Sequence, residues 1–247
     1  MENALLIGLS RQKALGRELD VIANNMANVT TNGFKARSSR FQEFLSPSAS
    51  ADAFPRPDRR LSYVIDSGTP LDVGAGPVER TGNPLDVAVR GEGFFAVQTP
   101  QGERYTRDGS FEINAQGQLV TSAGQPVAGE NGPITIGPQE SGLAIAPDGT
   151  VSTDQGQRGR LRLVRFDNPQ VLKNEGANLF SSPVAAQAAG PATRLLPGAV
   201  ERSNVKPVVE MSRLIEVNRS YSSVAGMVSR LDELRRSAIS RLADVPA

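Results

Sequence analysis

The chain has 247 residues, 38% of them hydrophobic, with 27 basic and 26 acidic residues and a formal net charge of +1. Such a length holds one large domain or two small ones, and the evenly mixed charge offers no basic run for nucleic acid or an anionic membrane. The sequence contains no His, Cys or Trp, which excludes thiol and imidazole catalysis, Ser-His-Asp triads and ordinary zinc sites.

The N-terminal stretch MENALLIGLSRQKALGRELD is charged too early and too often to form the apolar core of a signal peptide. No other stretch approaches the roughly 20 apolar residues that a membrane span requires. We therefore expect that, if the chain leaves the cytoplasm, it does so by another export route.

A helix is predicted from about residue 3 to residue 29. Its apolar residues are spaced by 4, 3, 4 and 3, which is typical of a narrow coiled-coil seam. These residues are Leu15, Leu19, Ile22, Met26 and Val29. The helix would be roughly 40 Å long, which is too long for a helix packed against a small core.

Asparagines and then a glycine mark the end of this helix. Asparagine competes with helix formation, and Asn24, Asn25 and Asn28 could place their amides toward neighbouring chains. The alternative is that they only mark a fraying helix end. Gly33 offers a left-handed stop, and Phe34 follows it as an anchor.

The middle of the chain is predicted to be β-rich. Residues 36–70 are small, polar and rich in proline, so they are predicted as an extended connector. Residues 71–200 hold most of the 24 glycines, and turns such as Asp108-Gly109 separate short alternating runs such as Leu85, Val87 and Val89. They are predicted as an antiparallel sandwich or barrel with a return connector over 181–200.

Residues 201–247 are predicted to form a second helix that begins around Val208, because Pro207 suits a helix start and not a helix interior. Its apolar residues are spaced by 3, 4, 3, 4 and 3. They are Leu214, Val217, Tyr221, Val224, Val228 and Leu231. Two terminal seams around a glycine-rich insert favour helix pairing over the alternative, in which both helices pack on a domain core.

No catalytic, cofactor or metal site is predicted. Ser10 and Lys13 match a serine-acylase spacing, but they lie in the first helix without the partner motifs of that class. Glu92, Asp108 and similar carboxylates lie beside turns, where solvated loop roles dominate.

Three stretches resemble the bacterial flagellar rod and hook proteins. They are ANNMANVTTNGFK (23–35), GNPLDVAVRGEGFFAVQTPQGERYTRDGSFEINAQGQLVTSAGQPV (82–127) and PGAVERSNVKPVVEMSRLIEVNRSYSSV (197–224). They follow the family's order and cover both ends and the centre of the chain. Within the family, the first residues, SNVKPVVEM and the modest length look most like the proximal-rod branch, with the distal-rod branch as the alternative.

The resemblance implies an α+β protein without enzymatic activity, in which the terminal helices pair as the inner layer of a hollow helical rod and a β domain lies outside. The implied partners are other rod subunits, further copies of the chain and the flagellar type III export apparatus, with no nucleic acid, cofactor or small-molecule substrate. The implied location is the basal-body rod in the periplasm, reached without a cleaved signal peptide, and the implied role is torque transmission.

The predicted assembly interface comprises the two seams, the asparagine-rich turn and one asparagine before the second helix. Its members are Leu15, Leu19, Ile22, Asn24, Asn25, Met26, Asn28, Val29, Gly33, Phe34, Asn204, Leu214, Val217, Tyr221, Val224, Val228 and Leu231. We expect the helices to pair antiparallel and to be partly disordered before assembly. The competing interpretations are a β-rich secreted enzyme and an adhesin with helical oligomerisation ends.

Overall fold

The computed structural model describes residues 2–46, 61–190 and 192–243. The chain divides into two compact units. We call Met1–Ala27, Arg37–Pro70 and Lys206–Ala247 the helical unit, and Asn28–Ala36 and Leu71–Val205 the β unit. The chain therefore passes between the units four times, and the turn that ends the first helix belongs to the β unit.

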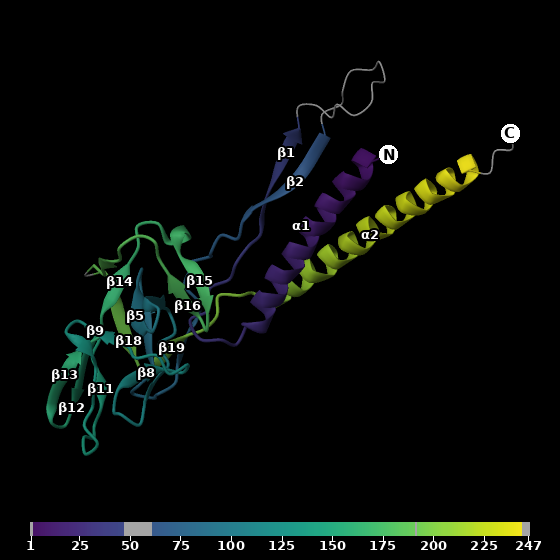
Figure 1. The fold of residues 1–247 in the computed structure, drawn as a ribbon. Coiled ribbons are helices and arrows are strands. Elements are labelled where there is room, and N and C mark those ends of the chain that lie inside the picture. The colour runs from purple at the N-terminus through teal and green to yellow at the C-terminus, as the bar shows by residue number, and fades with distance from the viewer. Residues whose placement is uncertain (1, 47–60, 191, 244–247) are drawn as a thin grey trace. The chain divides into compact units, whose positions relative to one another are not determined.

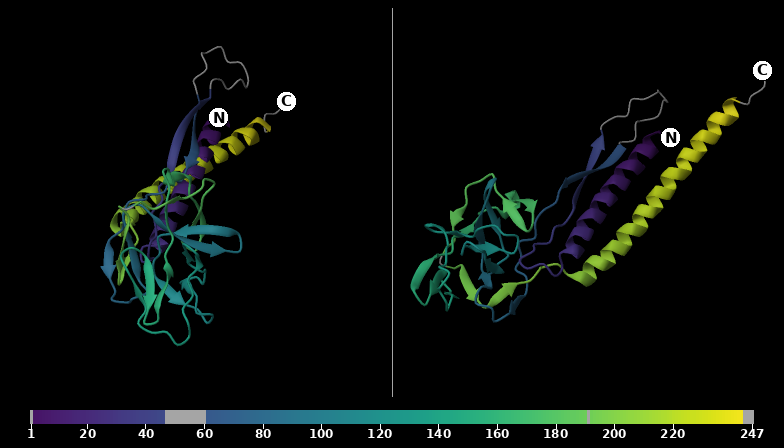
Figure 2. Two further views of the ribbon diagram at one scale, coloured as in Figure 1. Left: turned by 90° about the vertical axis from the view of Figure 1, so that its left-hand side faces the viewer. Right: turned by 60° about the horizontal axis from the view of Figure 1, so that its bottom comes forward.

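The helical unit is built on the two terminal helices, α1 (Glu2–Ala27) and α2 (Pro207–Ala243). They lie side by side and run in opposite directions (Figures 1 and 2). Contacts at three levels set their register, because Gly8 lies against Val228, Gly16 against Tyr221 and Glu18 against Arg213. The predicted α+β class and the pairing of the two helices are confirmed, and α2 begins with proline at its first residue as expected.

The sequence predicted an extended connector over residues 36–70, and here the structure differs. Strands β1 (Arg40–Ser46) and β2 (Leu61–Gly68) form an antiparallel hairpin, and β2 runs along α1. The prolines that suggested a connector, Pro47, Pro55 and Pro57, all lie between these strands, outside the described residues. Averaging the composition over the whole segment therefore hid the two flanking strands.

The β unit centres on a six-stranded antiparallel sheet with the order β15-β16-β6-β5-β14-β17. Its strands are β5 (Phe94–Thr99), β6 (Gly102–Thr106), β14 (Leu163–Arg165), β15 (Lys173–Gly176), β16 (Leu179–Ser181) and β17 (Gln187–Ala188). A short 3₁₀ helix, Pro169–Val171, precedes β15.

Shorter antiparallel pieces complete the unit. They are β3 (Val78–Arg80) with β19 (Ala199–Glu201), β4 (Val87–Arg90) with β18 (Arg194–Pro197), β7 (Phe111–Ile113) with β8 (Leu119–Thr121), β9 (Ala128–Gly129) with β10 (Gly132–Pro133), and β11 (Ala144–Ile145), β12 (Thr150–Thr153) and β13 (Gly156–Arg160) in one sheet. The predicted return connector over 181–200 thus contains strands that pair with β3, β4 and β14.

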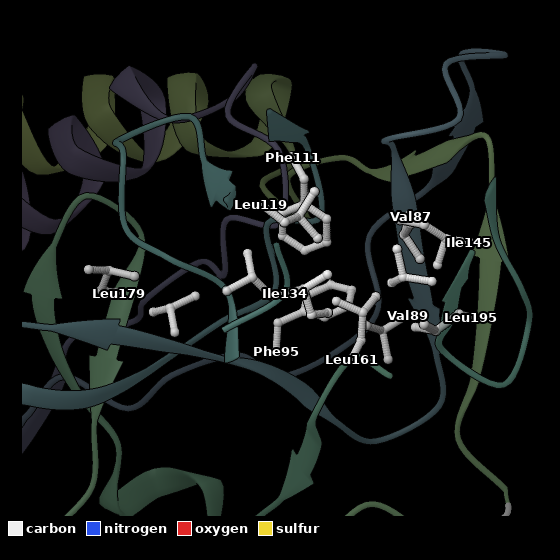
Figure 3. Packing of buried hydrophobic residues seen from close by; sticks show 13 residues of the cluster. Val87, Val89, Phe95, Phe111, Leu119, Ile134, Ile145, Leu161, Leu179 and Leu195 are labelled. Carbon is white, nitrogen blue, oxygen red and sulfur yellow. The ribbon is translucent and has the colours of Figure 1, made fainter. Parts of the chain in front are cut away.

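Hydrophobic clusters lie on both faces of β5, which explains its uninterrupted apolar run. Side chains alternate along a strand, so Phe95 joins one cluster with Phe111, at a ring-centroid distance of 5.0 Å. Phe94 joins the other cluster with Phe166 and Phe180, at 5.9 and 6.0 Å. Figure 3 shows the first cluster, which strands from several of the small sheets complete.

Candidate assembly site

The inner seam between α1 and α2 contains most of the apolar residues that the sequence singled out. Ile22 of α1 is 1% exposed, and Val217 and Val224 of α2 are also buried. Seven other predicted seam residues are half-buried. They are Leu15, Leu19, Met26, Leu214, Tyr221, Val228 and Leu231. The structure therefore places these side chains within the helical unit, where they cover one another.

Polar contacts fix the register of this seam. The guanidinium of Arg213 lies 2.6 Å from Oε1 of Glu18, and Gln12 Nε2 donates a hydrogen bond to the Tyr221 hydroxyl over 3.2 Å. A Cβ atom added at Gly8 would lie 2.8 Å from a methyl group of Val228, so close packing at this level requires glycine. Sliding one helix past the other would break all three contacts together.

Asn25 connects α1 to the chain that follows the turn. Its side-chain amide donates to the carbonyl of Arg37 over 2.8 Å and accepts from the amide of Arg37 over 3.0 Å, and the residue is 0% exposed. The Asn25 side chain thus bonds both backbone groups of Arg37, as a neighbouring β-strand would, shortly before the β1–β2 hairpin begins. Asn24 is exposed, and Asn28 accepts a hydrogen bond from Thr31 within the turn.

The turn over residues 28–36 is built into the β unit. Gly33 has a φ of +65°, and its amide donates to the carbonyl of Glu201 over 2.6 Å. Phe34 is buried, and its carbonyl accepts from the amide of Asn204. Val29 is half-buried. This turn and the chain before α2 therefore pack as one element of the β unit.

Asn204 is the centre of a hydrogen-bond network, which we call the junction. Its Oδ1 accepts from the amide of Ala36 over 2.7 Å, and its Nδ2 lies 3.0 and 3.1 Å from the carbonyls of Asp72 and Gly74. The amide of Asp72 also donates to the carbonyl of Ala36 over 2.8 Å. One asparagine thus joins three of the segments through which the chain enters and leaves the β unit.

Three buried charges lie beside this network. Lys35 Nζ lies 2.6 Å from Oε1 of Glu201, and Arg107 Nε lies 3.6 Å from its Oε2. Lys35 also donates to the carbonyl of Gly74, and Arg107 to that of Gly91. Burial lowers the pKa of both Lys35 and Arg107, and the Glu201 carboxylate opposes that effect at each of them. Glu201 is thus the counter-charge that two buried cations share.

Sequence reasoning missed Lys35, Glu201 and Arg107 because charged residues are usually exposed. A hint was available, since Lys35 and Glu201 both lie inside the stretches that carried the family resemblance. It also missed a set of large apolar side chains that point outward from the helices. These are Leu6, Leu9, Val208, Val209, Met211, Ile215, Met227, Leu234 and Ile239, which are 44–78% exposed.

None of the helices in the described part of the chain has the length and apolar character of a bilayer crossing. Within residues 2–46, 61–190 and 192–243, no three His, Cys, Asp or Glu side chains gather in a way that could hold a metal ion. The features that remain are two paired helices with exposed apolar side chains in one unit and a β unit with a buried polar network in the other.

Three family models match the chain in order. Residues 5–35 match "Flagella basal body rod protein", residues 88–153 match "Flagellar hook protein FlgE/F/G D1 domain" and residues 196–241 match "Flagellar basal body rod FlgEFG protein C-terminal". The first match covers most of α1 together with its terminal turn, and the third covers the chain from within β18 to near the end of α2.

Curated relatives match over nearly the full length. The chain is 42% identical to the flagellar basal-body rod protein FlgF of Caulobacter vibrioides, with 99% of this chain and 100% of the relative covered. It is 34% identical to FlgF of Mesorhizobium japonicum, with 98% of each covered. It is also 34% identical to the rod protein FlgG of Buchnera aphidicola, over 87% of this chain and 90% of that one.

Proposed function

The chain belongs to the flagellar basal-body rod protein family, and we propose that it is a proximal-rod subunit that polymerises through its terminal helices and transmits motor torque across the periplasm. The chain is a structural component of the basal body. Beyond this, we propose that the chain lies in the proximal rod, that its role there is mechanical, and that it has no enzymatic activity.

The exposed apolar side chains of the helical unit are the observation that carries this proposal. Val208, Met211 and Ile215 lie on one side of α2 and are 47–78% exposed, although each is large and apolar. Soluble monomers rarely leave such rows uncovered, so neighbouring chains are the natural partners. A contact between two different surfaces, repeated with a rotation that does not close, produces an open helical assembly such as a rod.

The comparisons support the proximal position. The relative of 42% identity carries the name FlgF, while the FlgG relative is 34% identical and covers less of the chain. The proposed partners are therefore the other proximal- and distal-rod proteins together with further copies of this chain. No nucleic acid or small-molecule substrate is part of this function.

The proposed route to the rod is the flagellar type III export apparatus, without a cleaved signal peptide. A narrow export channel requires an unfolded chain, and a sequence without cysteine has no disulfide that could hold it folded. The two helices bury only one face within the helical unit, which makes them easy to unfold before assembly.

The test replaces the native chain by Ile22→Asp in motile cells. Ile22 is 1% exposed in the inner seam, so a buried carboxylate should prevent helix pairing and abolish both rods and swimming. Leu19→Asp and Leu214→Asp, also in this seam, should act in the same way. Ser223→Asp, on an exposed face of α2, is the matched control.

The β unit reports whether the loss is specific. The NMR signals of Tyr105 should be the same in Ile22→Asp and in the native chain. Swimming cells with complete rods in the Ile22→Asp strain would refute a role for this seam in rod assembly.

A further inference from the structure

The outward faces of α1 and α2 each carry a second row of residues at alternating spacings of three and four. We call Leu6, Leu9, Lys13, Gly16, Asp20, Ala23 and Ala27 the α1 outer row, and Val208, Met211, Ile215, Asn218, Ser222, Ala225 and Ser229 the α2 outer row. Gly16, which borders the inner seam beside Tyr221, and Ala225 are half-buried, and every other member is exposed. This spacing is that of a helix–helix seam, so each outer row is suited to pack against another helix.

Side-chain size changes along both rows in the same order. The α1 outer row begins with Leu6 and Leu9 and ends with Ala23 and Ala27. The α2 outer row begins with three large residues and continues with small ones from Ser222 onward. Because the helices are antiparallel, the large end of each row lies level with the small end of the other.

The register of the inner seam gives the levels. Gly8 lies against Val228 and Glu18 against Arg213, so Leu6 and Leu9 lie at about the height of residues 222–228. By the same register, Val208 to Ile215 lie at about the height of residues 16–24 of α1. A neighbouring copy in the same orientation can therefore place its large residues against the small ones of this copy, at both ends of the contact.

A hollow lies beside the middle of the α1 outer row, between α1 and β2. Its volume is about 730 Å³, and Ala14 and Gly16 of α1 and Val64 of β2 are among its lining residues, with Lys13 and Asp20 at its border. The hollow lies at the level of Ile215 and Asn218 on an antiparallel helix. Small residues at such a position allow a second helix to approach closely.

Gly226 is an independent indication of a close neighbour. It lies in the interior of α2, next to the small end of the outer row, where glycine disfavours a helix relative to alanine. A Cβ atom added there would meet nothing within 4 Å, so no packing inside the described chain requires glycine at this position. A helix from another copy would give this glycine a role, because it would need the space that a side chain would fill.

We propose that the α1 outer row of one copy packs against the α2 outer row of the next copy, with large residues set into small ones. This contact rests on the proposed rod function and specifies its partner as a second copy of this chain. The two rows are different surfaces, so the contact is heterologous and leaves one unfilled row at each end of a growing assembly.

The absence of cysteine from the natural sequence allows a direct test. Leu9→Cys and Ser222→Cys chains with tags of different size are produced together in cells that lack the native chain, and basal bodies are isolated under mild oxidation. The expected product is the disulfide between Leu9→Cys and Ser222→Cys chains, without either homodimer. Homodimers in similar yield, or no disulfide in cells that swim, would overturn the proposal.

A matched pair of serines separates this contact from the rod function itself. Ser222 lies in the α2 outer row and Ser223 lies beside it on a different face, and both are exposed. Ser222→Leu should abolish swimming, while Ser223→Leu retains swimming and, when combined with Ser222→Cys, still forms the cross-link to Leu9→Cys chains. Equal behaviour of the two variants in swimming cells would refute the contact and leave the rod function intact, whereas failure of the native chain itself to support swimming would refute the function.

Discussion

The ammonium nitrogen of Lys35 lies 2.6 Å from Oε1 of Glu201, and each side chain is only 1% exposed. These residues are 166 positions apart, one at the end of the asparagine-rich turn and the other in β19. The pair therefore joins the turn over residues 28–36 to β19 inside the β unit. Because Arg107 lies on the other oxygen of the same carboxylate, Glu201 serves two cations.

Glu201→Gln should be more destabilising than Lys35→Met. The glutamine keeps the shape but leaves Lys35 and Arg107 without a counter-charge, and breaking a buried pair in this way costs about 3–5 kcal/mol. Lys35→Met leaves Glu201 still paired with Arg107, so its cost should be smaller. Urea unfolding followed by tyrosine fluorescence measures both, and the opposite order would contradict the role given to Glu201.

Gly33→Ala should release the turn from the β unit. The added Cβ would lie 2.3 Å from the backbone of Arg107, in addition to the strain of a positive φ. Gly82→Ala is the control, because Gly82 has a φ of +75° but nothing lies within 4 Å of its Cβ position. The control should lower the free energy of unfolding by only about 1–2 kcal/mol, the penalty for a residue other than glycine in the left-handed region. Faster hydrogen exchange at the Ala36 amide in Gly33→Ala alone confirms the prediction, whereas equal costs for the two variants would count against it.

Asn25→Ala should expose the entrance to the β1–β2 hairpin. It leaves both backbone groups of Arg37 without their partner, and an unsatisfied buried group costs about 1–3 kcal/mol. Asn25→Asp keeps an acceptor for the Arg37 amide, although it adds a buried charge and sets a carboxylate oxygen against the Arg37 carbonyl. Hydrogen exchange at that amide should therefore rise strongly in Asn25→Ala, less in Asn25→Asp and least in Asn24→Ala, where the side chain is exposed. Unchanged exchange in Asn25→Ala would refute the prediction.

Asp108 should make the β unit less stable as the pH rises from about 4 to about 6. Burial raises the pKa of this carboxyl from 3.8 to about 6, the charge of Asp86 adds to the effect, and hydrogen bonds from Ser110 and Ser122 oppose it. The folded state thus holds the proton more tightly than the unfolded state, so stability is lost as the pH rises through this window, by up to about 3 kcal/mol.

The matching variant is Asp108→Asn, which keeps an oxygen for the Ser110 amide but does not ionise. Its unfolding midpoint in urea should change less between pH 4 and pH 7 than that of the native chain. An identical pH dependence in the two proteins would show that Asp108 titrates at its ordinary pKa.

Limited trypsin digestion of the purified chain should leave a fragment that contains residues 71–205, with a fragment that contains residues 28–36 still bound. If the helices order only on assembly, exposed sites such as Arg11, Arg40 and Arg219 are cut first, while Lys35 is buried in the junction and resists. Mass spectrometry of the fragments that co-elute in gel filtration identifies the peptide. A chain that resists cleavage throughout would mean that the helices are already stably packed in the monomer.

The sequence was sufficient to predict the elements with strong periodicity. The seams around Ile22 and Val217 and the alternation through Val87 and Val89 predicted both helices and the β region. The β1–β2 hairpin was missed because the prolines between its strands dominated the composition of the segment. Periodicity reports which face of an element is buried, and this information is available without any knowledge of the partner.

The junction was not predictable in the same way. Asn204 was singled out only because it lies in a stretch resembling the rod family, and Lys35, Arg107 and Glu201 look like ordinary surface charges in a linear sequence. Their burial depends on bringing together segments that are 166 residues apart, and local patterns do not encode such a distance. The outer rows were missed because the inner seams had already accounted for the helical spacing.

The hydrogen bond from Asn204 to the carbonyl of Asp72 closes the segment 71–205 into a loop whose two ends lie side by side. A segment of this kind is a cassette: it can be lengthened, shortened or exchanged at its outer turns while the spacing of its attachment points stays fixed. Subunits whose terminal helices pack in the same way can therefore differ widely in the size of their β units. The most tolerant sites for an inserted tag or reporter domain in this chain are accordingly the exposed turns of the β11–β13 sheet, far along the sequence from either attachment point.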